Sequence, residues 1–242
     1  MSQSRQNTPI IFRDLHLESE IREALQLQNT PITATVLKRL LYLSIKNNRT
    51  INNFEGLEHA VNLRTLSVSQ HNLLSLEPLI SLGKLNSLTI HLNESITTKS
   101  LSSLTKLTDL QLKTVGDQEI EPLGSLLKLR RLSLDSAMIE DIQPISVLPN
   151  LKAFHLNRPI FSKKGHIALP KTLNELRITR AQLRNFDQFT MPKDLISLTL
   201  NINHISDLEG ISGLSHLVNL ELEENDIDNL EHLSPLQDIV WL

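Results

Sequence analysis

Apolar residues recur at a fixed spacing of 22 along most of the chain. The first apolar position of successive repeats is held by Leu63, Leu85, Leu107, Leu129, Leu151, Leu173, Leu195, Leu217 and Ile239. Each repeat continues with apolar residues three and five places later, as in Leu66 and Val68. An earlier repeat starts at Leu40 and is 23 residues long. So regular a period predicts a repeat protein whose neighbouring repeats share one core.

Inside one repeat, apolar and polar residues first alternate and then lose the alternation. Alternation over a few residues predicts a strand with its apolar side turned inward. The pattern LxxLxLxxNxI is typical of a leucine-rich repeat, and its clearest copies begin at Leu195 and Leu217. We therefore predict an α/β leucine-rich repeat solenoid over residues 40–242, with about nine repeats and an incomplete last strand. A curved parallel β-sheet should form its concave face, opposite an irregular or 3-10 helical convex side.

Residues 1–39 do not follow the period and are predicted to form an N-terminal tail and a helical cap. One helical side would carry the largely apolar set Leu17, Ile21, Ala24, Leu25 and Gln28. Asp14 or Ser19 could cap this helix, and Thr33 could cap a second short helix before the first strand. Such a cap would cover the leucines at the end of the repeats.

The ninth position of a leucine-rich repeat is usually Asn, whose amide can satisfy backbone groups in the turn after the strand. Here the position reads Asn48, His71, Asn93, Val115, Ala137, Pro159, Ala181, Asn203 and Asn225. Asn is present towards both ends and lost in the middle. We therefore expect altered turns from Val115 to Ala181.

Side chains at repeat positions 3, 5 and 7 should point to the concave side, with position 8 at its rim. Residues 128–194 hold twelve basic and six acidic residues, whereas residues 195–242 hold nine acidic residues and no Lys or Arg. The candidate partner-binding residues on this face are Arg131, His155, Arg158, Arg177, Arg180, Asn201, Glu221, Glu223 and Glu224. A face with one basic and one acidic pole predicts a protein partner selected by charge complementarity.

The acidic pole does not indicate a metal site. Strand residues two apart, such as Glu221 and Glu223, lie about 7 Å from each other, whereas ligands of one ion must converge on it. Glu175 and Arg177 could form a weak surface salt bridge along one strand. The chain contains no GxSxG, GxxxxGK[ST], HExxH or GxGxxG motif. We predict no enzyme activity, no cofactor and no metal ion.

Composition restricts the classes of partner and the cellular compartment that we expect. Hydrophobic residues make up 40% of the chain and aromatic residues 3%, so aliphatic side chains must form the core. A net charge of −3 and a single concave aromatic, Tyr42, argue against nucleic-acid binding. No apolar run is long enough for a membrane span or a signal peptide, which predicts no membrane insertion and a cytoplasmic location. A secreted or cell-surface location is the alternative if an export signal has been removed.

Three quoted segments carry a family resemblance. IFRDLHLESEIREALQL, ITATVLKRLLYLSI and INNFEGLEHAVNLRTLSV, together with the 22-residue repeat, resemble the start of the internalin-type leucine-rich repeats of Gram-positive bacteria. The Gly-Leu-Glu step at Gly56–Glu58 is part of this likeness. The resemblance implies a helical cap before the repeats and a protein-binding module that is often displayed on the cell surface.

Three functional hypotheses follow, and all of them concern binding. The chain could be a protein-interaction module, a cytoplasmic regulator or inhibitor of the immunity type, or a fragment of a surface adhesin that binds a host protein. The end of the chain, QDIVWL, adds a separate expectation. Either the last strand near Trp241 mediates end-to-end association, or this end is frayed or self-capped.

Overall fold

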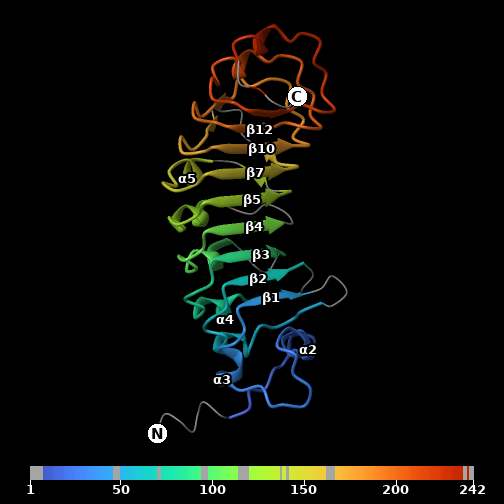
Figure 1. Ribbon diagram of the computed structural model, residues 1–242, viewed down its shortest axis with the longest axis vertical. Coiled ribbons are helices and arrows are strands. Elements are labelled where there is room, and N and C mark those ends of the chain that lie inside the picture. Colours follow the sequence, from blue (N-terminus) through green and yellow to red (C-terminus); the bar gives the residue numbers. More distant parts are fainter. Residues whose placement is uncertain are drawn as a thin grey trace. The chain divides into compact units, whose positions relative to one another are not determined.

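The computed structural model describes residues 8–45, 50–69, 72–93, 98–113, 120–136, 138–139, 142–161, 167–236 and 239. The chain divides into two compact units, an N-terminal unit of residues 1–112 and a C-terminal unit of residues 113–242. Figure 1 shows the parallel strands of each unit lying side by side, with the short helices of the return segments at one end of the strands.

The N-terminal unit begins with the predicted helical cap. Helix α2 spans Leu15–Ala24, and its N-cap is Asp14, whose carboxylate accepts hydrogen bonds from the backbone N–H groups of residues 16 and 17. Ser19 lies inside the helix and is not its cap. Helix α3, Ala34–Leu37, has the predicted N-cap Thr33. Asp14 also accepts a hydrogen bond of 2.6 Å from the backbone N–H of Asn52 and so joins the cap to the first repeat.

The apolar side of α2 is narrower than predicted. Leu17, Ile21 and Leu25 are buried, but Ala24 and Gln28 are exposed. The chain leaves the helix through Gln26, which has a φ of 55°, and the N–H groups of Gln26 and Leu27 donate to the carbonyls of residues 23 and 22. This left-handed turn ends the helix and directs Gln28 away from the core.

The strands occur where the alternation predicts them. In the N-terminal unit they are β1 Tyr42–Ile45, β2 Thr65–Val68, β3 Ser87–His91 and β4 Asp109–Lys113, the last of which ends just beyond the unit. The return segments hold η1 Leu57–His59, α4 Glu77–Ile80 and η2 Thr98–Leu101. Strands β1, β2 and β3 are parallel, with Leu43, Leu66 and Leu88 in register. All three leucines are buried, as the inward side of the alternation requires.

The C-terminal unit repeats this plan. Its main strands are β5 Arg131–Asp135, β7 Ala153–Asn157, β10 Glu175–Thr179, β12 Ser197–Thr199 and β13 Asn219–Glu221, hydrogen-bonded in that order. Its return segments hold η3 Glu121–Ser125, α5 Gln143–Ser146, η4 Glu209–Ile211 and η5 Glu231–Leu233. One fully buried row runs through the five strands at repeat position 4: Leu132, Phe154, Leu176, Leu198 and Leu220.

The asparagines at position 9 act as predicted in the C-terminal unit. The side-chain amide of Asn203 donates to the carbonyls of Ile178 at 2.9 Å and Leu200 at 2.7 Å, and its oxygen accepts from the N–H groups of Ala181 and Leu183. Asn225 makes equivalent bonds one repeat later, donating to the carbonyls of residues 200 and 222. The sites at Asn48, His71, Val115 and Ala137 lie outside the described residues.

The turns in the middle of the chain are altered where the structure describes them. Short parallel strands follow the main strands there: β6 Met138–Ile139 pairs with β8 Ile160–Phe161, and β9 Ile167–Ala168 pairs with β11 Phe189–Thr190. The rings of Phe161 and Phe189 meet edge to face, with 5.7 Å between centroids. Extra backbone pairing thus accompanies the loss of the asparagine at Pro159 and Ala181.

Candidate functional site

The candidate site is the open face of the C-terminal unit, defined by the side chains at repeat positions 3, 5 and 7. Position 5 forms one row across five strands: Ser133, His155, Arg177, Thr199 and Glu221. The hydrogen-bonded register places Arg177 and Glu221 on either side of Thr199. Because neighbouring strands are about 4.8 Å apart, the backbones of Arg177 and Glu221 lie roughly 10 Å apart on one face. The structure therefore brings a basic and an acidic candidate into a single row.

Two predicted face residues are not exposed. Thr199 is 2% exposed and Ala153 is 5% exposed. Both are small, and longer charged residues flank them in register: Arg177 and Glu221 beside Thr199, and Arg131 and Glu175 beside Ala153. The short side chains therefore lie below the level of their neighbours, and the charged side chains dominate the surface.

Position 8 places side chains at the rim through a left-handed backbone turn. Ser136, Arg158, Arg180, Ile202 and Glu224 are spaced by 22 residues and have φ values between 52° and 60°. Their backbones still take part in the ladder, because the N–H of Arg158 donates to the carbonyl of Thr179 at 2.9 Å. The backbone of each rim residue is thus fixed even where its side chain is exposed.

Arg158 is held by a carboxylate of the preceding repeat. Its guanidinium contacts both carboxylate oxygens of Asp135, with Nη2 at 2.9 Å from Oδ1 and 3.1 Å from Oδ2. Asn157 donates to Asp135 Oδ1 at 3.0 Å, and Thr179 Oγ1 donates to Asn157 Oδ1 at 3.0 Å. This chain of side-chain hydrogen bonds crosses three strands at position 7. Asp135 therefore offsets part of the positive charge predicted at Arg158.

His155 is also engaged within the face. Its Nε2 lies 2.8 Å from Oε1 of Glu175 on the adjacent strand, and both side chains are partly buried. Glu175 contacts His155 and not Arg177, with which it was predicted to pair. In the register of β7 and β10, His155 lies beside Arg177, and Glu175 reaches His155 diagonally from beside Ala153. Arg131, at repeat position 3 and the first residue of β5, is exposed.

Arg177 and Arg180, like Arg131, are exposed cations of the basic pole. Among the described residues, no carboxylate lies within ion-pair distance of the guanidinium of Arg177 or Arg180. In the acidic pole, Glu221 accepts a hydrogen bond of 3.3 Å from Asn201, and Asn201 in turn accepts one of 3.1 Å from the backbone N–H of Glu223. Glu223 and Glu224 are exposed. The two poles stand on β10 and β13, with the uncharged strand β12 between them.

Sequence reasoning missed the partners that neutralise part of the basic pole. Asp135 and Asn157 occupy position 7 of adjacent repeats, and Glu175 lies twenty residues after His155. A side chain at position 3 of one repeat is close to position 5 of the repeat before it. The position of each residue within the 22-residue repeat could therefore have indicated the contact of His155 with Glu175. Trp241, the residue for which end-to-end association was predicted, lies outside the described residues.

In the part of the chain that the structure describes, no three His, Asp or Glu side chains are placed to hold a metal ion. Among the same residues, no helix combines the length and the apolar character needed to cross a membrane.

Known structures share this architecture. An internalin from Listeria monocytogenes, InlF, superposes with a TM-score of 0.67 at 21% identity, over 100% of this chain and 78% of that one. Internalin C2 of the same organism gives 0.62 at 22% identity, over 96% and 94% of the two chains. A leucine-rich repeat protein of Leptospira interrogans gives 0.61 at 19% identity, over 91% and 56%. No family model and no curated protein sequence matches the chain. The fold is thus a leucine-rich repeat of the internalin type.

Proposed function

We propose that this protein is a non-enzymatic interaction module that binds a protein partner through the open face of its C-terminal unit. The observation that carries the proposal is the row at position 5, where Arg177 and Glu221 lie in register on the two sides of β12. Leucine-rich repeats offer such faces as extended binding surfaces. The internalin-type architecture supports the same class of function.

The charge pattern specifies what the partner must present. Arg177 and Arg180 favour an acidic group, and Glu221, Glu223 and Glu224 favour a basic group about 10 Å away along the row. Complementary charges of this kind raise the association rate and fix the register of the two surfaces more than they add affinity. A partner docked in the reversed orientation would face like charges at both poles.

The open face is suited to recognition because much of it is fixed before binding. The ion pair of Arg158 with Asp135 and the hydrogen bond between Asn201 and Glu221 restrain side chains that would otherwise lose rotamer freedom on binding. Binding of a partner therefore costs less side-chain conformational entropy, because folding has already ordered part of the surface.

Affinity capture with charge-swapped variants tests this proposal. The wild type is compared with the double variant Arg177→Glu with Glu221→Lys, using both a lysate and a surface fraction. The matched control is Lys171→Glu with Asp228→Lys, which also preserves the net charge but changes exposed residues outside the face. We expect one protein to be captured by the wild type and by the control and lost by the face variant.

The outcome also separates the three functional hypotheses. A captured cytoplasmic protein would favour the regulator or immunity-type role, and a host surface protein would favour the adhesin. Equal capture by all three forms would contradict the use of this face. Loss of capture by both double variants would indicate a general effect of charge and not a specific binding site.

A further inference from the structure

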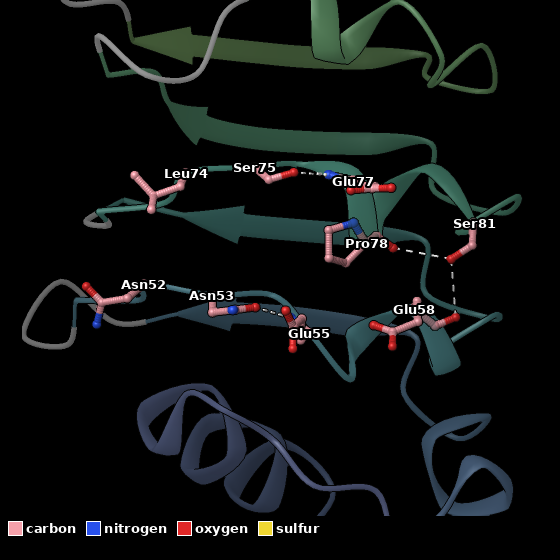
Figure 2. Close-up of a pocket in the computed structure, with 9 residues that line it drawn as sticks. All are labelled: Asn52, Asn53, Glu55, Glu58, Leu74, Ser75, Glu77, Pro78 and Ser81. Atoms are coloured by element: carbon pink, nitrogen blue, oxygen red, sulfur yellow. Dashed lines mark hydrogen bonds between the residues drawn. The ribbon is translucent and has the colours of Figure 1, made fainter.

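A groove lies between the first two return segments of the N-terminal unit. Figure 2 shows Asn53, Glu55 and Glu58 along one segment and Leu74, Glu77 and Pro78 along the other. The groove has a volume of about 450 Å³ and a largely apolar lining. This volume is within the range of protein ligand sites.

Local hydrogen bonds fix both walls of the groove. The side-chain oxygen of Asn53 accepts from the backbone N–H of Glu55 at 2.5 Å, and that of Ser75 accepts from the N–H of Glu77 at 3.0 Å. The hydroxyl of Ser81 can donate to the carbonyl of Pro78 at 3.2 Å or to that of Glu58 at 3.4 Å. The second of these bonds links the two segments. These hydrogen bonds therefore hold the groove in shape without a ligand.

Leu74 is an apolar side chain that faces solvent. It occupies repeat position 12 and is 76% exposed. The same position is polar in six later repeats: Gln118, Glu140, Ser162, Arg184, Ser206 and Asp228. Ile96 is the other exception, and the corresponding residue of the first repeat is Asn52. Leu74 and Pro78 thus give the groove an apolar surface that most repeats lack at this place.

The rim of the groove is acidic. Of the described residues that line it, three are Glu and none is Lys or Arg. Glu55 already pairs with a guanidinium, since Arg13 Nε lies 2.8 Å from its Oε2. Glu58 accepts from the backbone N–H of Gly56 at 2.7 Å. For Glu77 no basic partner lies within ion-pair distance among the described residues.

Local structure accounts for the presence of Glu77 but not for its combination with the exposed Leu74. As the first residue of α4, Glu77 is favoured by the partial positive charge of the helix start. Glu209 holds the equivalent place at the start of η4, without an apolar neighbour at position 12, where Ser206 stands. The exposed leucine beside a carboxylate is what distinguishes this groove from its counterpart.

We propose that this groove binds an extended segment of a partner protein in which basic and aliphatic residues alternate. The aliphatic side chains pack on Leu74 and Pro78, and a Lys or Arg side chain pairs with Glu77. Successive side chains of an extended peptide point to opposite sides, so the aliphatic side chains face the lining and the long Lys or Arg side chains reach back to the carboxylates at the rim. Charge complementarity selects this occupant over an acidic one. The proposal does not depend on the open face of the C-terminal unit.

Peptide binding to the full chain tests the proposal. The probe is a fluorescein-labelled peptide, Gly-Lys-Leu-Lys-Leu-Lys-Gly, and its counterpart has Glu in place of each Lys. Fluorescence anisotropy is measured for the wild type, Leu74→Asn, Glu77→Gln and the matched control Glu209→Gln. We expect the basic peptide to bind the wild type, about tenfold weaker binding for each groove variant, and no more than about a twofold change for the control. The affinity should also fall as salt is added.

Four results would overturn the proposal. They are equal binding of both peptides, no binding of either, unchanged binding by the groove variants, or a loss with Glu209→Gln as large as with Glu77→Gln. Sedimentation adds one more test, because self-association of the wild type that Leu74→Asn abolishes would make a second copy the occupant instead. Circular dichroism shows that each variant is folded. Arg177→Glu with Glu221→Lys should leave peptide binding unchanged, which keeps this test separate from that of the open face.

Discussion

The turn after β12 is held from inside by a buried amide, whereas the turn after β7 is tied at the outer rim by an ion pair. Asn203 is 5% exposed, and its amide bonds both to its own repeat and to the repeat before it. At Pro159 that amide is missing, and Arg158 contacts both oxygens of Asp135 at the surface instead. Both devices join adjacent repeats, but one is buried and the other is half-exposed.

The difference shows which residues of a repeat are available for recognition. Removing a buried hydrogen-bonding group leaves its partners unsatisfied, and each costs about 1–3 kcal/mol. A surface ion pair contributes little to stability, so its members can exchange partners at small cost. Position 9 is therefore committed to the fold, whereas the rim at position 8 can serve binding.

Of the substitutions that test this comparison, Asn203→Ala should lower the stability most. The N–H groups of Ala181 and Leu183 and the carbonyl of Ile178 would lose the amide of Asn203. The carbonyl of residue 200 would keep the bond that it accepts from Asn225. We expect the free energy of unfolding to fall by about 3 kcal/mol, measured by urea denaturation. A loss below about 1 kcal/mol would mean that water replaces the amide, and that the turn is not held from inside.

Asn225→Ala should cost less, although the hydrogen bonds look alike. Asn225 is only half-buried, so water can reach several of the groups that its amide now satisfies. We expect a loss of about 1 kcal/mol in the same urea experiment. Equal losses at residues 203 and 225 would show that burial does not decide the value of this amide.

The sequence predicted the repeats, the strand register and the helix caps because these depend on local pattern. The alternation alone places Leu198 inside and Arg177 outside, and Asp14 and Thr33 are strong capping residues. It did not predict the short pairs such as β6 with β8, because two-residue strands carry no periodic signal. The pairing of His155 with Glu175 was missed because it joins two side chains that lie diagonally on adjacent strands, and the alternation along one strand does not indicate such a contact.

Ile202→Asn should stabilise the turn that precedes Asn203. Ile202 has a φ of 60°, a left-handed conformation that β-branched residues disfavour and Asn tolerates. We expect the free energy of unfolding to rise by about 0.7 kcal/mol, since the relief of strain exceeds the loss of a half-buried side chain. Ile202→Val is the matched control and should give no gain, because it keeps the branch at Cβ. A decrease with Asn would show that packing of Ile202 outweighs the strain.

The ion pair at the rim should give the smallest effect. A double-mutant cycle with Asp135→Asn and Arg158→Gln removes the contributions that Asp135 makes through Asn157, and so isolates the pair itself. We expect a coupling energy of about 0.5 kcal/mol, lower still in 1 M salt, because the Arg158 side chain is 50% exposed. A coupling above about 2 kcal/mol would place Arg158 with the structural residues. A small value leaves its guanidinium able to turn from Asp135 to an acidic group of a partner, which is what binding at the basic pole requires.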